Sequence, residues 1–166
     1  MIWIRTATRS DLPRVREILV DAWHATYDSI YGEDKVNEIC ADWHSLRSIE
    51  ENFDRQHSEF LVADEGANVV GMAFATQDGK TIKLHQLYVH PDFHGKKAGF
   101  HLLIEIENSF MDCDTISLEV EENNSRAVDF YKAYGFEISG RTENCGRDGS
   151  GIPALTMSKP IIYADE

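Results

Sequence analysis

Residues 94–99 of this 166-residue chain read His-Gly-Lys-Lys-Ala-Gly, a loop that could bind a phosphate group. The loop follows a strand-forming stretch, 81–89, and leads directly into an apolar helical segment, 100–111. A glycine-bearing loop that leaves a strand and opens a helix directs successive backbone N–H groups, with the helix dipole behind them, at one point. The two lysines add positive charge in a chain whose formal net charge is -13. The loop therefore predicts a site for a phosphate-bearing ligand.

Four segments, taken together, resemble the GCN5-related N-acetyltransferase (GNAT) family. They are Leu-Tyr-Val-His-Pro at 87–91, the loop at 94–99, Asn-Ser-Arg-Ala at 124–127, and Phe-Tyr-Lys-Ala-Tyr-Gly-Phe at 130–136. In that family the loop reads Q/R-x-x-G-x-G/A and wraps the pyrophosphate of acetyl-CoA, while N-x-x-A-x-x-x-Y marks the helix on the acceptor side. Here His94 stands where Gln or Arg is usual, and Lys97 stands where the family has its first glycine. We take the added charge of Lys97 as favouring binding of the polyanion.

The resemblance implies a function and a set of binding residues. It implies an N-acetyltransferase that moves the acetyl group of acetyl-CoA directly to a primary amine within a ternary complex. The cofactor-binding residues that it implies are Leu87, Tyr88, Val89, His94, Gly95, Lys96, Lys97, Ala98, Gly99, Asn124 and Tyr131. The acceptor stays open between a small amine or polyamine and a protein N-terminal amine. A non-catalytic protein that binds or senses acyl-CoA is the alternative, and a homodimer is a state that the family often adopts.

Tyr131 is the candidate for the acid that protonates the departing thiolate. It lies in the second turn of a helix that Asn124 can cap, and long helical side chains lean toward the N-terminus. Its spacing from Ala127, Phe130 and Tyr134 is also that of an ordinary core stripe. Spacing alone favours the core interpretation, whereas the family's tyrosine at this place favours the acid.

Glu119 is the candidate for the base that deprotonates the amine. It lies on the polar face of a strand, 115–121, whose apolar residues alternate to the other face. Leu118-Glu119-Val120 with Asn124 and Tyr131 is similar to the branch of the family that acetylates the N-terminal alanine of a ribosomal protein, in which the matching glutamate is the base. Glu119 could equally solvate an open strand face. His85, on a neighbouring strand, is the other candidate, and water could relay the proton to either.

Two other chemistries are disfavoured. His85, His90, His94 and His101 cluster in sequence, but Pro91 interrupts them and no helical pair of metal ligands results, so no metal site is predicted. Cys113 has nothing beside it in sequence that would activate it as a covalent carrier. The three cysteines show no paired spacing, which is typical of reduced thiols.

The order of apolar patterns predicts the fold. Helical periods occupy 12–23, 36–43 and 46–53, and strand patterns joined by short turns follow from 60 to 89. The later strand-helix-strand order requires at least one parallel pair. We expect an α+β (α/β) GNAT fold, with a mixed, mostly antiparallel sheet of six to seven strands and about four helices. Residues 1–160 would form a single N-acetyltransferase domain, and 161–166 a C-terminal tail.

Composition excludes several classes of partner. A 42% hydrophobic and 27% charged chain is globular, and no apolar run approaches the length of a membrane span. The net charge of -13 argues against a nucleic-acid surface, which needs a basic footprint, and is compatible with cationic amines. We therefore expect a cytoplasmic protein that binds neither nucleic acid nor membrane.

Overall fold

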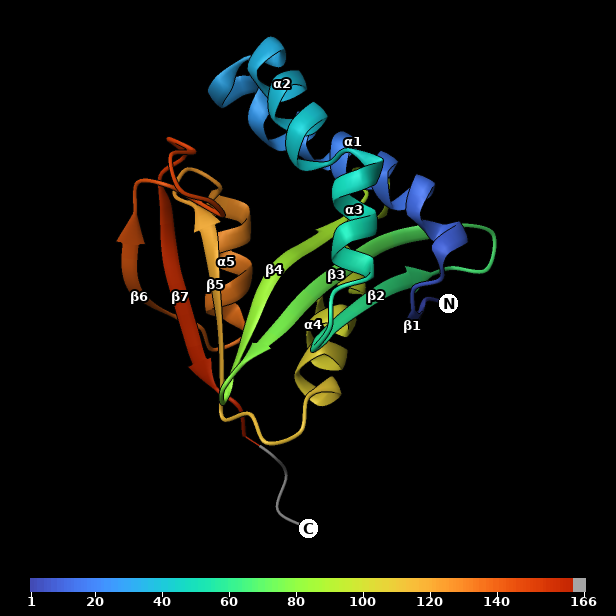
Figure 1. Cartoon of the computed structure of the whole chain (residues 1–166), viewed down its shortest axis with the longest axis vertical. Coiled ribbons are helices and arrows are strands. Elements are labelled where there is room, and N and C mark those ends of the chain that lie inside the picture. The colour runs from blue at the N-terminus through green and yellow to red at the C-terminus, as the bar shows by residue number, and fades with distance from the viewer. Residues whose placement is uncertain (163–166) are drawn as a thin grey trace. The chain divides into compact units, whose positions relative to one another are not determined.

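The computed structural model describes residues 1–162 as seven β-strands, five α-helices and two short 3-10 helices (Figure 1). In chain order these are β1 (Trp3–Thr6), η1 (Arg9–Asp11), α1 (Leu12–Tyr31), α2 (Glu33–Trp43), α3 (Leu46–Phe53), β2 (Ser58–Asp64), β3 (Val69–Asp78), β4 (Thr81–Val89), η2 (Pro91–Phe93), α4 (Ala98–Ser109), β5 (Thr115–Glu121), α5 (Ser125–Ala133), β6 (Glu137–Thr142) and β7 (Ala154–Pro160). The strands pair in the order β1-β2-β3-β4-β5-β7-β6. Strands β4 and β5 are parallel, whereas β1 with β2, β5 with β7, and β6 with β7 are antiparallel. The mixed, mostly antiparallel sheet is confirmed, with five helices where about four were expected.

Two compact units divide the chain. Unit 1 comprises Met1–Ala75 and Gln86–Ser109, and unit 2 comprises Thr76–His85 and the residues from Phe110 onward. The single domain expected from the sequence stays a prediction, and residues 163–166 of the expected tail lie outside the described residues. Among residues 1–162, none of the helices combines the length and the apolar character needed to cross a membrane.

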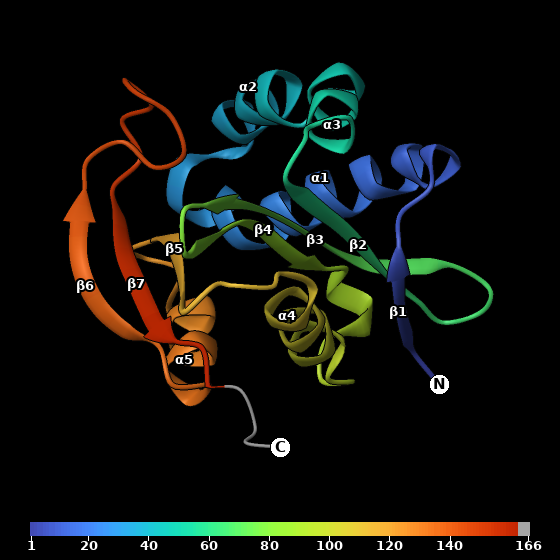
Figure 2. The same ribbon diagram turned by 60° about the horizontal axis from the view of Figure 1, so that its bottom comes forward.

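In unit 1, helix α1 buries the face that its apolar spacing predicts. Val15, Ile18 and Leu19 are fully buried and share a core cluster with Val62 of β2 and Met72 of β3. Helices α1 and α3 lie over one face of the unit's strands, and α4 lies on the other (Figure 2). Because burying one large apolar side chain contributes about 1.5–3 kcal/mol, this face holds α1 on the strands.

Gly71 of β3 lets the end of β4 and helix α4 approach closely. A Cβ atom at this position would lie 3.1 Å from the Tyr88 carbonyl oxygen, 3.2 Å from Leu102 Cδ1 and 3.3 Å from Val89 Cγ2. These separations are shorter than ordinary van der Waals contact. The missing side chain at residue 71 therefore helps to set the position of the last residues of β4.

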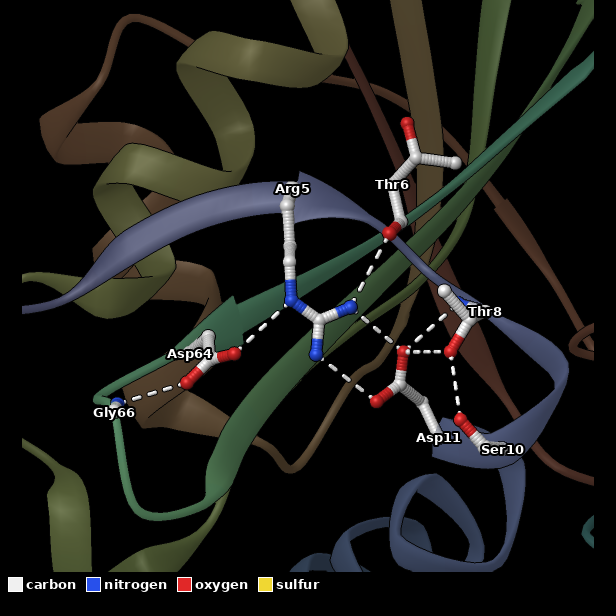
Figure 3. Close-up of polar contacts among 7 residues, drawn as sticks. All are labelled: Arg5, Thr6, Thr8, Ser10, Asp11, Asp64 and Gly66. Atoms are coloured by element: carbon white, nitrogen blue, oxygen red, sulfur yellow. Dashed lines mark hydrogen bonds and ion pairs between the residues drawn. The ribbon is translucent and has the colours of Figure 1, made fainter.

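A network around Arg5 fixes the first strand of unit 1 (Figure 3). Arg5 donates to both oxygens of Asp11, at 2.7 and 3.0 Å, and to Asp64 Oδ2 at 3.0 Å. The same carboxylates accept from backbone N–H groups, Asp11 from Thr8 and Asp64 from Gly66, each at 2.8 Å. The hydrogen bonds from Arg5 are the largest cause that lowers the pKa of Asp11 to about 2. The network ties β1 to η1 and to the β2–β3 turn.

In unit 2, strand β5 separates a packed face from a polar face, as its alternation predicts. Ile116, Leu118 and Val120 are buried, and Leu118 pairs with the buried Met157 of β7. Glu119 between them is exposed. Helix α5 lies beside β5 and β7 in both views of the molecule (Figures 1 and 2). The polar face of β5 therefore presents Glu119 to solvent.

Candidate active site

The predicted phosphate loop of unit 1 has the backbone of a glycine-rich loop. Gly95 has φ +82°, and Lys97 has φ +62°, the left-handed conformation that glycine favours. Lys97 thus keeps the conformation suited to the glycine that the family pattern has here, at a cost of about 1–2 kcal/mol for a residue with a Cβ atom. The helical hydrogen bonds of α4 begin with the His101 N–H, which donates to the Lys97 carbonyl at 3.0 Å. The N–H groups of Ala98 and Gly99 precede that bond and are therefore placed to meet an anion.

His94 and Lys96 show how the loop uses its side chains. His94 Nε2 lies 3.0 Å from the Val89 carbonyl oxygen, which can only accept, so this nitrogen carries a hydrogen and donates. This bond ties the loop back to the end of β4. Lys96 Nζ lies 5.2 Å from the ring centroid of Phe93, and Lys96 and Lys97 are both exposed. The loop therefore offers two solvent-facing cations beside the start of α4.

Two side-chain hydrogen bonds hold the end of β4 to helix α1. The Trp23 indole N–H donates to the Tyr88 hydroxyl at 3.2 Å. His90 Nδ1 accepts from the Asp92 backbone N–H, so its Nε2 is the protonated nitrogen that donates to Asp21 Oδ2 at 2.9 Å. Sequence reasoning missed both contacts, because pairs so far apart along the chain leave no local pattern. Leu87, Tyr88 and Val89 are thus positioned from α1 as well as from the sheet.

Helices α1 and α2 bring aromatic rings together near this strand end. The ring centroid of Trp23 lies 4.4 Å from that of Tyr27, 5.7 Å from that of Trp43 and 5.4 Å from that of His44. The ring centroids of Tyr27 and Tyr31 are 6.0 Å apart. We call these five residues the aromatic cluster. Rings at such separations pack favourably in tilted or edge-on geometry. Trp23, Tyr27 and His44 are buried, so the aromatic cluster packs α1 against α2.

Unit 2 carries both candidate bases on one face of its strands. The parallel ladder pairs Lys83 of β4 with Ser117 of β5, so the next residues on that face are His85 and Glu119. Both are exposed. His85 Nε2 lies 2.7 Å from Thr76 Oγ1, whereas Glu119 Oε2 accepts from the Gly146 backbone N–H at 2.8 Å. The two candidates therefore follow directly after the last pair of the ladder, Leu84 with Leu118, on the same face of their strands.

Asn124 and Tyr131 hold the places in α5 that the sequence predicts. Asn124 caps the helix, because its Oδ1 accepts from the Ala127 N–H at 3.2 Å. Tyr131 is buried, with ring centroids 5.2 Å from Phe130 and 5.4 Å from Phe136. Its ring is part of the packed core, as its spacing indicates. Its role as an acid stays a prediction.

The described residues also bear on metal binding and on the reactivity of two thiols. No group of three or more His, Cys, Asp or Glu side chains within residues 1–162 could hold a metal ion. Burial raises the pKa of Cys40 to about 11 and is the largest cause that raises the pKa of Cys113. Raised pKa values keep both thiols protonated and poorly nucleophilic.

Comparison with known proteins identifies the family. The Acetyltransferase (GNAT) domain family matches residues 27–161. A spermidine N(1)-acetyltransferase of Thermoplasma acidophilum is 27% identical over 146 residues, which cover 82% of this chain and 89% of the relative.

Solved structures share the fold along nearly the whole chain. The PaiA N-acetyltransferase of Thermoplasma acidophilum in complex with coenzyme A has a TM-score of 0.81 at 24% identity, covering 96% of this chain and 99% of that one. A ribosomal-protein-alanine N-acetyltransferase of Brucella melitensis has a TM-score of 0.72 at 26% identity, with 95% and 99% covered. The chain belongs to the GNAT acetyltransferase family, and it is an acetyl-CoA-dependent N-acetyltransferase.

Proposed function

We propose that the protein acetylates a primary amine of a small polycation of the spermidine type by direct transfer from acetyl-CoA. The observation that carries this choice is the acidic character of the helical pair that holds the aromatic cluster. Six acidic side chains are exposed on α1 and α2 against two exposed cations, Arg16 and Lys35, and the six are Glu17, Asp21, Glu33, Asp34, Glu38 and Asp42. Carboxylates attract a polycation, and the partly exposed rings of Tyr31 and Trp43 can bind ammonium groups. The relative that acts on spermidine supports the same substrate class.

The cofactor would be held by backbone groups and two cations. The N–H groups at the start of α4, with Lys96 and Lys97, would bind the pyrophosphate, and His94 would keep the loop closed on Val89. The backbone at the end of β4 would meet the pantetheine arm and stabilise the oxyanion that forms on the thioester carbonyl. Asn124 would hydrogen-bond the same arm in addition to capping α5.

Acetyl transfer would then need two proton transfers by side chains and one to solvent. Glu119 takes a proton from the substrate ammonium, directly or through a water molecule, and the free amine attacks the thioester carbonyl carbon. When the C–S bond breaks, the Tyr131 hydroxyl gives its proton to the departing thiolate. The attacking nitrogen, which becomes cationic when it bonds to the carbonyl carbon, releases its second proton to solvent. The products are the acetylated amine and CoA, and Glu119 and Tyr131 regain their starting protonation by exchange with solvent. His85, which lies on the same strand face as Glu119, is the alternative base.

The test is a comparison of acceptors at fixed acetyl-CoA, with released CoA thiol as the readout. Spermidine should give a higher kcat/KM than a peptide with an N-terminal alanine, and its advantage should shrink as salt screens the carboxylates. A preference for the peptide would favour a protein N-terminus as acceptor, as in the Brucella neighbour. The cytoplasmic location expected from the sequence also stays a prediction.

A further inference from the structure

The segment between β6 and β7, residues 143–153, is folded tightly on itself. The Cys145 N–H donates to the Ile152 carbonyl at 2.8 Å, and the Gly151 N–H donates to Asn144 Oδ1 at 3.0 Å. Three of its glycines, at 146, 149 and 151, have φ between +68° and +74°, which residues with a Cβ atom rarely adopt. Its hydrogen bonds and glycines set a defined backbone path, which directs the N–H of residue 146 toward strand β5.

Glu119 receives two donors from this segment. The Gly146 N–H donates to Glu119 Oε2 at 2.8 Å, and the Cys145 thiol hydrogen-bonds the same carboxylate. Burial first, and then the charge of Glu119, raise the pKa of Cys145 to about 12. The thiol therefore stays protonated at neutral pH, as a donor must. Hydrogen bonds to a charged acceptor are the stronger kind.

Of the two carboxylates on the polar face of β5, only Glu119 receives its hydrogen bonds from the β6–β7 segment among the bonds described. Glu121, two residues along β5, is buried, and its oxygens accept from the backbone N–H and the side-chain amide of Asn123, at 2.7 and 3.1 Å. Glu119 is exposed, and an exposed glutamate without such donors samples many rotamers. When hydrogen bonds fix one oxygen of a carboxylate, the other oxygen also keeps a fixed orientation. A general base requires such an orientation.

We propose that the β6–β7 segment is a positioning clamp for the catalytic base: the Gly146 N–H and the Cys145 thiol hold the Glu119 carboxylate in the orientation that accepts the proton of the amine. Cys145 and Gly146 are positioning residues in this scheme, because they act through Glu119. The inference rests on the proposed role of Glu119 as the base.

The first test compares two variants of Cys145. Cys145→Ala removes the donor and should lower kcat by about 3- to 10-fold, the effect of losing one hydrogen bond from the weak S–H donor, with the KM for acetyl-CoA unchanged. Cys145→Ser keeps a donor and should retain kcat within about twofold of the wild type. Equal activity of all three proteins, or an equal fall in both variants, would overturn the clamp.

A matched glycine pair tests the backbone donor. Gly146→Ala and Gly149→Ala introduce the same left-handed strain, because the two residues have φ +74° and +73°. The Gly146 N–H donates to Glu119, so relaxation of strain in Gly146→Ala should displace the donor and lower kcat. Gly149→Ala should leave kcat near the wild-type value, and the same loss in both variants would mean that only the fold of the segment matters.

A measurement independent of catalysis separates the clamp from the base. Glu119→Gln removes the charge beside Cys145, so the iodoacetamide alkylation rate of Cys145, followed by peptide mass mapping, should rise several-fold. Glu137→Gln, which changes an exposed carboxylate of β6, should leave the rate unchanged. An unchanged rate in Glu119→Gln overturns the clamp while the base role still stands. Full acetyl transfer by Glu119→Gln overturns the base role, and with it the positioning inference, whatever the alkylation rate.

Discussion

Replacing Lys97 by glycine should change stability and cofactor binding in opposite directions. Lys97 has φ +62°, which costs a residue with a Cβ atom about 1–2 kcal/mol, while glycine loses about 0.5–1 kcal/mol through the entropy of the unfolded chain. The difference predicts that Lys97→Gly stabilises the fold by about 0.5–1 kcal/mol, or a Tm rise of about 1–4 °C in a chain of this size. Thermal and urea unfolding would measure it.

The same change removes one positive charge from the proposed pyrophosphate site. Two unit charges about 5 Å apart in water interact by about 0.8 kcal/mol, and salt reduces this further. Lys97→Gly should therefore weaken acetyl-CoA binding by about threefold, measured by calorimetric titration at low salt.

Two further variants separate charge from strain. Lys97→Ala should lose affinity by the same factor without the gain in stability, because alanine keeps the strained backbone. Lys96→Ala should also lose affinity, with unfolding unchanged. Tighter acetyl-CoA binding by Lys97→Gly than by the wild type would refute the reasoning, because it would mean that the lysine side chain obstructs the phosphates more than its charge attracts them.

Three more predictions follow from the described contacts. Tyr131→Phe should lower kcat by about 10²-fold or more while the acetyl-CoA Kd stays constant; a parallel loss of both would remove Tyr131 from the acid role. Asp11, whose pKa Arg5 lowers to about 2, should contribute stability that is complete above about pH 5 and is lost as pH falls toward 2. Solvent screening limits this contribution to about 1 kcal/mol. Asp11→Asn should therefore lower the free energy of unfolding, measured with urea, by that amount at pH 7 and by much less near pH 2. An equal decrease at both pH values would contradict the ion-pair explanation. Gly71→Ala should cost about 1–3 kcal/mol through overpacking and should weaken acetyl-CoA binding, whereas wild-type stability would show that α4 and the end of β4 can move apart freely.

The elements and the family were predictable because their signals are local. The alternation in β5, the apolar face of α1 and the cap at Asn124 each depend on residues within a few positions of one another, and all three are present in the structure. The turn between β3 and β4 also has a local signal, because Gly79 has a φ of +58°, which favours glycine.

Contacts that join distant segments were not predictable. The Gly146 donor to Glu119 is a backbone N–H, which leaves no side-chain signal, and the bond between Trp23 and Tyr88 joins residues 65 positions apart. The conformation of the loop residue Lys97 was only partly predictable. Its mismatch with the family pattern was visible in the sequence, but only the backbone shows that a lysine has taken a left-handed conformation there.

The most direct test of the account is mass spectrometry of spermidine incubated with acetyl-CoA and the protein. Direct acetyl transfer predicts a product one acetyl group heavier than spermidine, formed in proportion to released CoA and about 10²-fold or more slowly by Tyr131→Phe. Binding of acetyl-CoA with no acetylated product from spermidine or from an alanine peptide would contradict it and would favour a protein that only senses acyl-CoA.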